Sequence, residues 1–314
     1  MLDPSICFKA RMSKDSRFDG KFFTAVLTTG IFCRPICPAR AAKEENVRYF
    51  NNAVSAQDAG FKPCKRCFPE RAPEQVLPRK MKRIEEYLLT THESINDIAN
   101  QLGYSERQFR RIFSDYFGIA PKQYRQHHQL LLARKLLLTT ALPIADVCFA
   151  AGFNSVRRFN EQIKAVYELS PTALRHKHGK IPHASHVTIK LQYRPPFDWS
   201  EMLKFFQLRQ LTGIEHVTDN SYQRSFCFDG KTGWLKVTKA ANEHALNLAV
   251  TIEDYSLLNK IIMKVRRMFD LDADMTLIHQ HLAKDELLAP LVDKYQGIRL
   301  PGCWDIFEFS IRAI

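Results

Sequence analysis

Four of the eight cysteines fall in two close pairs within the first quarter of the chain. Three residues separate Cys33 from Cys37, two separate Cys64 from Cys67, and 26 lie between the pairs. Two short cysteine pairs with this separation are typical of a zinc site, because four thiolates match the tetrahedral preference of zinc. The spacing predicts that the four cysteines bind one zinc ion. It leaves open whether such a site is only structural or also reactive.

Basic residues surround both cysteine pairs. Arg34 lies within the first pair and Arg40 follows it, whereas Lys62 precedes the second pair and Lys65 and Arg66 lie within it. Four thiolates on one zinc ion carry an excess of negative charge, so neighbouring cations offset it and can also bind phosphate groups. The residues that we expect to contact phosphate are Arg34, Arg40, Lys65 and Arg66.

The positive charge of the whole chain, +13 at pH 7 with a pI near 9.4, is unevenly distributed. Residues 1–75 hold 13 basic and 8 acidic residues, and residues 76–180 hold 17 and 9. Residues 181–314 are neutral, with 16 of each sign. This distribution indicates a polyanionic partner for the first 180 residues, such as DNA. A charge that serves solubility alone is the alternative.

The chain has no apolar run near the roughly 20 residues that span a bilayer. Its N-terminus lacks the basic and then apolar pattern of a signal peptide. We therefore expect a cytoplasmic, nucleoid-associated protein that does not contact a membrane. In that compartment, paired cysteines more often bind metals or react than form structural disulfides.

Residues 22–70 resemble, nearly from end to end, the N-terminal methylphosphotriester domain of the Ada DNA repair proteins. The matching runs are TTGIFCRP, CPAR, ENV, AGF and PCKRC. The resemblance implies that Cys33 irreversibly takes a methyl group from a methylated backbone phosphate of DNA, so that each molecule acts once. It also implies that Cys37, Cys64 and Cys67 remain as the other zinc ligands. Thr29, in the first matching run, is expected to contact DNA.

The implied chemistry is physically reasonable. A free thiol has a pKa of about 8.5, whereas zinc coordination deprotonates it. A methyl phosphotriester is uncharged, so a thiolate meets less repulsion there than at an ordinary phosphodiester. Transfer of the methyl group removes one negative charge from the zinc site, which strengthens its attraction to DNA. Repair is thereby coupled to tighter binding and to activation of alkylation-response genes.

The remaining cysteines, Cys7, Cys148, Cys227 and Cys303, have no partner at motif spacing. We interpret them as structural or incidental residues. No motif like Pro-Cys-His-Arg is present, so repair of O6-methylguanine, a second activity of some Ada proteins, is not expected.

After a proline-rich joint at residues 72–78, two segments repeat the same pattern about 50 residues apart, at 94–125 and 143–175. Each predicts a helix, a tight glycine turn, and a second helix that begins after Ser105 or Asn154 as N-cap. This is the pattern of a helix-turn-helix motif, whose second helix enters a major groove of DNA.

Basic and amide side chains occupy the same positions on the second helix of both repeats, which suits contacts to phosphates and base edges. A solvated helix face is the alternative. The paired repeat resembles the AraC-type DNA-binding domain over residues 80–178. The resemblance implies a monomeric protein that binds adjacent major grooves of double-stranded DNA and has RNA polymerase as a partner. The expected DNA contacts are Arg107, Gln108, Arg111, Arg157 and Arg158.

The last third follows a linker expected at residues 176–186 and has a mixed pattern of strands and helices. Residues 187–300 resemble the N-terminal domain of the 3-methyladenine DNA glycosylases of the helix-hairpin-helix class. In that family the catalytic aspartate lies in a helical domain, whose start matches residues 301–314, so glycosylase activity is not expected here. The alternating Asp270, Asp272 and Asp274 lack the pattern of a calcium loop and predict a solvated turn at a helix end.

We therefore predict a multidomain α+β chain. Its parts are a small α/β zinc domain at 1–75, an all-α double helix-turn-helix domain at 80–178, an α+β domain at 187–300, and the start of a truncated helical domain at 301–314. The predicted function is DNA methylphosphotriester repair coupled to transcription activation. The alternatives are a transcription factor with a purely structural zinc domain and a non-catalytic fragment of a glycosylase fusion.

Overall fold

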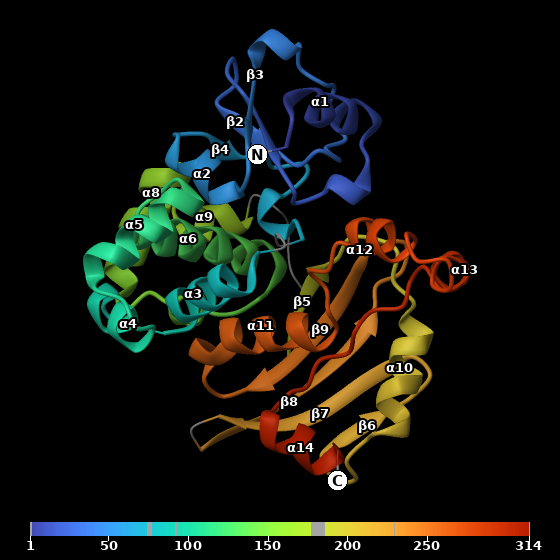
Figure 1. Cartoon of the computed structure of the whole chain (residues 1–314). Coiled ribbons are helices and arrows are strands. Elements are labelled where there is room, and N and C mark those ends of the chain that lie inside the picture. The colour runs from blue at the N-terminus through green and yellow to red at the C-terminus, as the bar shows by residue number, and fades with distance from the viewer. Residues whose placement is uncertain (1, 74–76, 92, 177–185, 229, 314) are drawn as a thin grey trace. The chain divides into compact units, whose positions relative to one another are not determined.

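The computed structural model describes residues 2–73, 77–91, 93–176, 186–228 and 230–313. The chain forms two compact units (Figure 1). The first contains residues 1–138 and 142–180, and the second contains residues 139–141 and 181–314. The linker expected at 176–186 lies mostly outside the described residues, which omit 177–185.

The N-terminal part of the first unit is a small four-stranded sheet, and helix α2 contacts all four of its strands. The strand order is β3-β1-β2-β4, in which β1 is antiparallel to both β2 and β3, and β4 runs parallel to β2. The helix α1 begins at Pro4 after its N-cap Asp3. The elements are α1 (Pro4–Ser13), β1 (Phe23–Val26), β2 (Ile31–Cys33), β3 (Val47–Phe50), α2 (Ala53–Asp58) and β4 (Lys62–Pro63).

The rest of the first unit is helical, as the repeat predicts. The two helix-turn-helix motifs are α4–α5 and α7–α8, and the long helix α6 joins them (Figure 1). Both turns contain a glycine with positive φ, Gly103 at +78° and Gly152 at +86°, where a side chain would be strained. The helices are α3 (Arg79–Thr90), α4 (Ile95–Gln101), α5 (Glu106–Phe117), α6 (Pro121–Thr139), α7 (Ile144–Ala150), α8 (Val156–Tyr167) and α9 (Pro171–His176).

The N-caps of the two second helices differ from the prediction at one position. Ser105 caps α5 in a capping box, as expected. The helix α8 is capped by Ser155, whose side chain accepts a hydrogen bond from Arg158 N, and not by Asn154. The repeats differ by one residue before this helix, so the equivalent of Ser105 is the residue 50 positions later.

One apolar core extends through both parts of the first unit. Phe23, Phe32 and Val54 from the sheet and α2 belong to the same buried cluster as Phe113 and Phe117 from α5. The Ser55 hydroxyl also donates to the Phe117 carbonyl, 3.2 Å away. Residues 1–75 and 80–178, which the sequence divides into two domains, thus lie in one compact unit and share one apolar core.

The second unit is an antiparallel five-stranded sheet with helices on one face. The strand order is β5-β9-β8-β7-β6. Phe206 of α10, Tyr222 of β7 and Phe269 just after α11 pack together, with ring centroids 5.1–5.6 Å apart. The elements are β5 (Val187–Gln192), α10 (Trp199–Leu208), β6 (Glu215–Val217), β7 (Ser221–Phe228), β8 (Lys231–Lys239), β9 (Ala245–Ile252), α11 (Leu258–Met268), α12 (Met275–Leu282), α13 (Ala289–Lys294) and α14 (Ile306–Ala313).

The prediction of a solvated aspartate turn after α11 is wrong for two of its three residues. Asp272 is 8% exposed and accepts hydrogen bonds from the guanidinium of Arg266. Asp274 is 6% exposed and caps α12 by accepting from Leu277 N. The turn is buried because arginines from distant segments contact it: Arg194 donates to the Asp272 carbonyl at 3.0 Å and Arg299 to the Asp270 carbonyl at 2.6 Å. Local spacing does not report such contacts. Within the described residues, no helix is both long and apolar enough to cross a bilayer.

The shared core of the first unit gives a first prediction. Phe113 is fully buried and stacks on Phe117 and Tyr124, so Phe113→Ala should lower the free energy of unfolding by about 3–5 kcal/mol. Hydrogen exchange measured by mass spectrometry should lose protection together in peptides from β1 and from α5.

The matched control is Tyr116→Ala on the same helix, where the side chain is 44% exposed and a much smaller loss is expected. Loss of protection in α5 alone, with β1 unchanged, would show that the two parts unfold separately.

Candidate metal centre and nucleic-acid interface

The sheet of the first unit brings the two cysteine pairs together. Cys33 is the last residue of β2, and Cys64 follows β4, the strand parallel to it. The backbone N–H of Cys64 donates to the Phe32 carbonyl, 3.0 Å away, which fixes the register of the two strands. A tight turn, closed by Cys37 N donating to the Arg34 carbonyl at 3.1 Å, returns Cys37 toward the same edge. All four sulfurs lie within 4.8 Å of one another.

The donor set fits a zinc ion. Tetrahedral zinc with Zn–S bonds of about 2.3 Å places its sulfurs about 3.8 Å apart, within the observed spread. Backbone N–H groups also stabilise charge on the sulfurs, from Arg34 to Cys67 Sγ and from Arg66 to Cys64 Sγ, both at 3.3 Å. Zinc with four thiolates is therefore the chemistry that this arrangement supports.

The crowded thiols perturb one another in the absence of a metal. Hydrogen bonds among the sulfurs raise the pKa of Cys33 and Cys67 and lower that of Cys64, and the bond with Cys33 lowers the pKa of Cys37 to about 7. Protons are thus shared unequally among four groups that cannot all ionise together. A bound zinc ion takes the place of these protons, since metal ligation requires the thiolate form.

The four sulfurs differ in access to solvent. Cys64 and Cys67 are 7% and 6% exposed, whereas Cys33 and Cys37 are half-buried. Cys33 and Cys37 are therefore more accessible to a large substrate than Cys64 and Cys67.

The expected phosphate contact by Arg34 is not available in the structure. Arg34 is 8% exposed, and its guanidinium forms a buried ion pair with Asp19 and donates to the Cys67 carbonyl at 3.1 Å. Its side chain is directed inward by these contacts with Asp19 and the Cys67 carbonyl. Arg34 therefore holds the metal loop against residue 19 and is not a surface cation.

The other predicted contacts around the metal centre lie on the surface. Thr29 is exposed in the turn between β1 and β2, and Arg40, Lys65 and Arg66 are also exposed. Arg40, Lys65 and Arg66 each lie within three residues of a cluster cysteine, so exposed positive charge lies close to the cluster.

The predicted DNA-contacting residues of the helix-turn-helix motifs are exposed on α5 and α8. Gln108 also closes the capping box, because its Oε1 accepts from Ser105 N at 3.1 Å. Arg157 forms an i,i+4 ion pair with Glu161 at 3.1 Å, with a side chain that is 90% exposed. Such an exposed pair is weak and can be exchanged for a phosphate. The exposed residues are Arg107, Gln108, Arg111, Arg157 and Arg158.

The four unpaired cysteines have no role in the metal centre. Cys7 and Cys148 are fully buried, and burial raises the pKa of each thiol to about 11. Cys227 and Cys303 are exposed in the second unit. The buried pair fits the structural interpretation.

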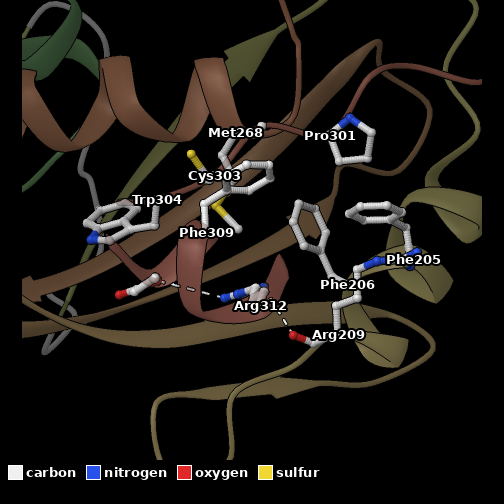
Figure 2. Close-up of a pocket in the computed structure, with 11 residues that line it drawn as sticks. Phe205, Phe206, Arg209, Met268, Pro301, Cys303, Trp304, Phe309 and Arg312 are labelled. Atoms are coloured by element: carbon white, nitrogen blue, oxygen red, sulfur yellow. Dashed lines mark hydrogen bonds and ion pairs between the residues drawn. The ribbon is translucent and has the colours of Figure 1, made fainter. Parts of the chain in front are cut away.

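A separate cavity of about 240 Å³ lies in the second unit, between α10, the end of α11 and α14 (Figure 2). Aromatic rings of Phe205, Phe206 and Phe309 line it, and Arg312 lies beside them. The carboxylate among the residues that line the cavity, Glu308, forms an ion pair with Arg224 at 2.6 Å. The cavity is thus mainly apolar, and its charged groups hold α14 against the sheet.

Sequence reasoning missed the buried charges beside the metal centre. Glu70 and Arg134 form an ion pair in which the side chains are 1% and 2% exposed. Asp19 and Arg34 form the second such pair. The signal in the sequence was the Arg134-Lys135 pair between two apolar stretches of α6, but it does not identify which cation is buried or its partner.

Three family models match successive parts of the chain. They are the metal binding domain of Ada at residues 6–70, a helix-turn-helix domain at 98–177, and the AlkA N-terminal domain at 188–305. The three matched segments correspond to the three parts that the sequence resembles.

Curated relatives agree with this order of parts. A Mycobacterium tuberculosis protein named "Probable bifunctional transcriptional activator/DNA repair enzyme AlkA" is 36% identical over 98% of this chain and 64% of its own length. The chain therefore spans somewhat less than two thirds of that relative. The DNA-3-methyladenine glycosylase 2 of Escherichia coli is 31% identical over 40% of this chain and 42% of its own.

A third relative matches about half of this chain over most of its own length. It is the bifunctional transcriptional activator/DNA repair enzyme AdaA of Bacillus subtilis, 32% identical over 54% of this chain and 81% of its own length. Together with the matched metal-binding and helix-turn-helix models and the four-sulfur cluster, this coverage shows that the chain belongs to the Ada family of bifunctional transcriptional activators and DNA repair proteins.

Proposed function

We propose that this chain removes methyl groups from DNA methylphosphotriesters by irreversible transfer to Cys33, once per molecule, and that the methylated protein binds DNA more tightly and activates transcription. The observation that carries the proposal is a four-sulfur cluster in which Cys64 and Cys67 are buried, whereas Cys33 and Cys37 are half-buried.

The hydrogen bonds of the cluster support Cys33 as the acceptor. Backbone N–H groups stabilise charge on Cys64 and Cys67, and that of Ala39 does so on Cys37. A sulfur that accepts an N–H bond is a weaker nucleophile because its negative charge is already partly satisfied. Arg34, the residue after Cys33, directs its own N–H to Cys67 Sγ. The more reactive sulfur is thus expected at position 33.

The transfer step balances without a further reactant. Zinc, when bound, keeps the cysteines deprotonated. The Cys33 sulfur attacks the methyl carbon from the side opposite its bond to the phosphate oxygen. The new S–C bond forms as the C–O bond breaks, and the electron pair of that bond leaves on the oxygen, which restores the charged phosphodiester. The product is a thioether, which is too stable to return the methyl group.

The same step changes the charge that faces DNA. Conversion of a thiolate to a thioether removes one negative charge from a site surrounded by Arg40, Lys65 and Arg66, so the attraction to phosphate rises. The exposed recognition helices α5 and α8 provide sequence-specific contacts in the same compact unit. Double-stranded DNA is the proposed partner of a monomer that recruits RNA polymerase, in the cytoplasm at the nucleoid.

Two other functions compete with this proposal. A transcription factor with a purely structural zinc domain would share the fold and the exposed arginines, but it has no need for a half-exposed sulfur beside a basic surface. A glycosylase would need a polar group free to act on a base. The cavity of the second unit instead has its carboxylate, Glu308, paired with Arg224. Glycosylase activity is therefore not proposed for this chain.

Methyl transfer can be tested by mass spectrometry of the zinc-loaded full chain mixed with duplex DNA that carries methylphosphotriesters. The intact mass should rise by one CH2 unit per molecule and no further, and fragment spectra should place it on Cys33. Cys33→Ser should show no gain, whereas the control Cys227→Ser, at an exposed cysteine in the second unit, should behave as the native chain. Absence of any gain with zinc bound would favour a structural site.

The helix-turn-helix interface can be tested by the salt dependence of binding to unmodified duplex DNA. Arg107→Ala and Arg111→Ala should each lower affinity and reduce the slope of log K against log salt by about 1, because each removes one phosphate or base contact. Lys204→Ala, an exposed cation on α10 of the second unit, is the control and should leave the slope unchanged. Equal slopes for all variants would show that Arg107 and Arg111 of α5 do not contact the DNA.

The second unit can be tested by a base-release assay on DNA that contains 3-methyladenine. We expect the chain to release no free base above the spontaneous rate, because the carboxylate of its apolar cavity is held in an ion pair. The E. coli glycosylase serves as the positive control. Release by this chain would contradict the proposal and assign catalysis to the second unit.

A further inference from the structure

Arg134 connects the middle of α6 to the cysteine cluster of the first unit. Its side chain is 2% exposed and forms an ion pair with Glu70, which lies three residues after Cys67. The same guanidinium donates from Nη2 to the Cys64 carbonyl, 3.3 Å away. It is enclosed by the rings of Phe68 and Tyr167, whose centroids lie 5.7 and 5.9 Å from Cζ. One arginine of the DNA-binding helices thus contacts residues on both sides of the second cysteine pair.

This buried ion pair is a costly way to stabilise a fold. Burial raises the pKa of Glu70, and the charge of Arg134 opposes that effect. Replacing such a pair by apolar residues of similar size is often neutral or stabilising, so the pair by itself gives little reason for its presence. What an apolar pair does not supply is a donor to the Cys64 carbonyl. The contact with the Cys64 carbonyl is therefore the feature that requires an arginine at position 134.

The Cys64 carbonyl belongs to the short loop that holds two of the four sulfurs. Within this loop, Arg66 N donates to Cys64 Sγ at 3.3 Å, which depends on the orientation of the peptide groups between the two cysteines. A cationic donor on the Cys64 carbonyl fixes the first of these peptide planes. Groups that orient metal ligands in this way raise metal affinity although they do not touch the metal.

We propose that Arg134 is a positioning residue of the metal centre, through which α6, the helix that joins the two helix-turn-helix motifs, sets the geometry of the Cys64–Cys67 loop. The inference rests on zinc as the ion bound by the four cysteines, as proposed above. Because coupling between two sites is reciprocal, zinc binding stabilises α6 by the same free energy that α6 contributes to zinc binding. The metal centre and the DNA-binding helices are then one thermodynamic unit.

The test uses the full chain, with zinc affinity measured by chelator competition and ligand geometry by the absorption bands of the cobalt-substituted protein. Arg134→Met should weaken zinc binding about 10-fold, the lower end of the effect of removing an outer-shell partner, and shift the cobalt bands. Because this variant leaves Glu70 buried and unpaired, the double variant Glu70→Gln with Arg134→Met is also measured. It removes both charges and should recover stability, but not zinc affinity.

The matched control is Arg125→Met on the same helix. Arg125 donates to the carbonyls of Leu88 and Glu93 within the helical part, at 2.9 Å each, so its loss should leave zinc affinity and the cobalt bands unchanged. The proposal is overturned if the double variant binds zinc within about twofold of this control and its cobalt bands match the native ones. Failure of methyl transfer in the native chain would instead contradict the proposed function and leave the zinc measurements interpretable.

Discussion

Four cysteine sulfurs within 4.8 Å of one another are the constraint on which the first unit depends. Thiolates at such distances repel one another strongly unless a cation lies between them, so the cluster requires a metal or retains its protons. The parallel pairing of β2 and β4 creates the crowding, and the N–H groups that point at the sulfurs make it tolerable. The reactivity proposed for Cys33 is a consequence of charge that the fold has already concentrated there.

Arginines serve two opposite purposes around this cluster. Arg34 and Arg134 are buried in ion pairs with Asp19 and Glu70, and each also donates to a carbonyl of a cysteine. Both hold the backbone that carries the sulfurs. Exposed cations such as Arg66 lie on the same loops and face solvent. A loss of negative charge at the cluster would change the electrostatic field at the exposed cations directly. It would act on the buried arginines through the backbone that carries the sulfurs.

The second unit also contains a buried arginine whose ion pairs hold one segment of the chain against another. Arg224 is buried beside Glu215 and pairs with Glu308 of α14, while Arg312 of that helix also reaches Glu215, 2.8 Å away. These ion pairs attach α14 to the sheet, although most of the apolar side chains of α14 are exposed. The apolar cavity of this unit lies between α14, α10 and the end of α11 (Figure 2).

Local sequence determined most of the elements and the identity of the metal ligands. Cysteine spacing, glycine turns and the 50-residue repeat each report a short segment whose geometry depends on neighbours in the chain, so the zinc cluster and both helix-turn-helix motifs were predictable. The resemblances added the choice of Cys33, which spacing alone does not distinguish from the other three cysteines.

Tertiary structure alone decided which charges are buried. The sequence places Arg34 and Arg66 equally close to a cysteine, yet one is enclosed by Asp19 and the other faces solvent. The partners of Arg34 and Arg134 lie 15 and 64 residues away, and Asp272 after α11 is contacted by Arg266 and by the distant Arg194. The reason is physical: whether a charge meets water or an opposite charge depends on chain segments brought together by folding, and no local pattern encodes that encounter.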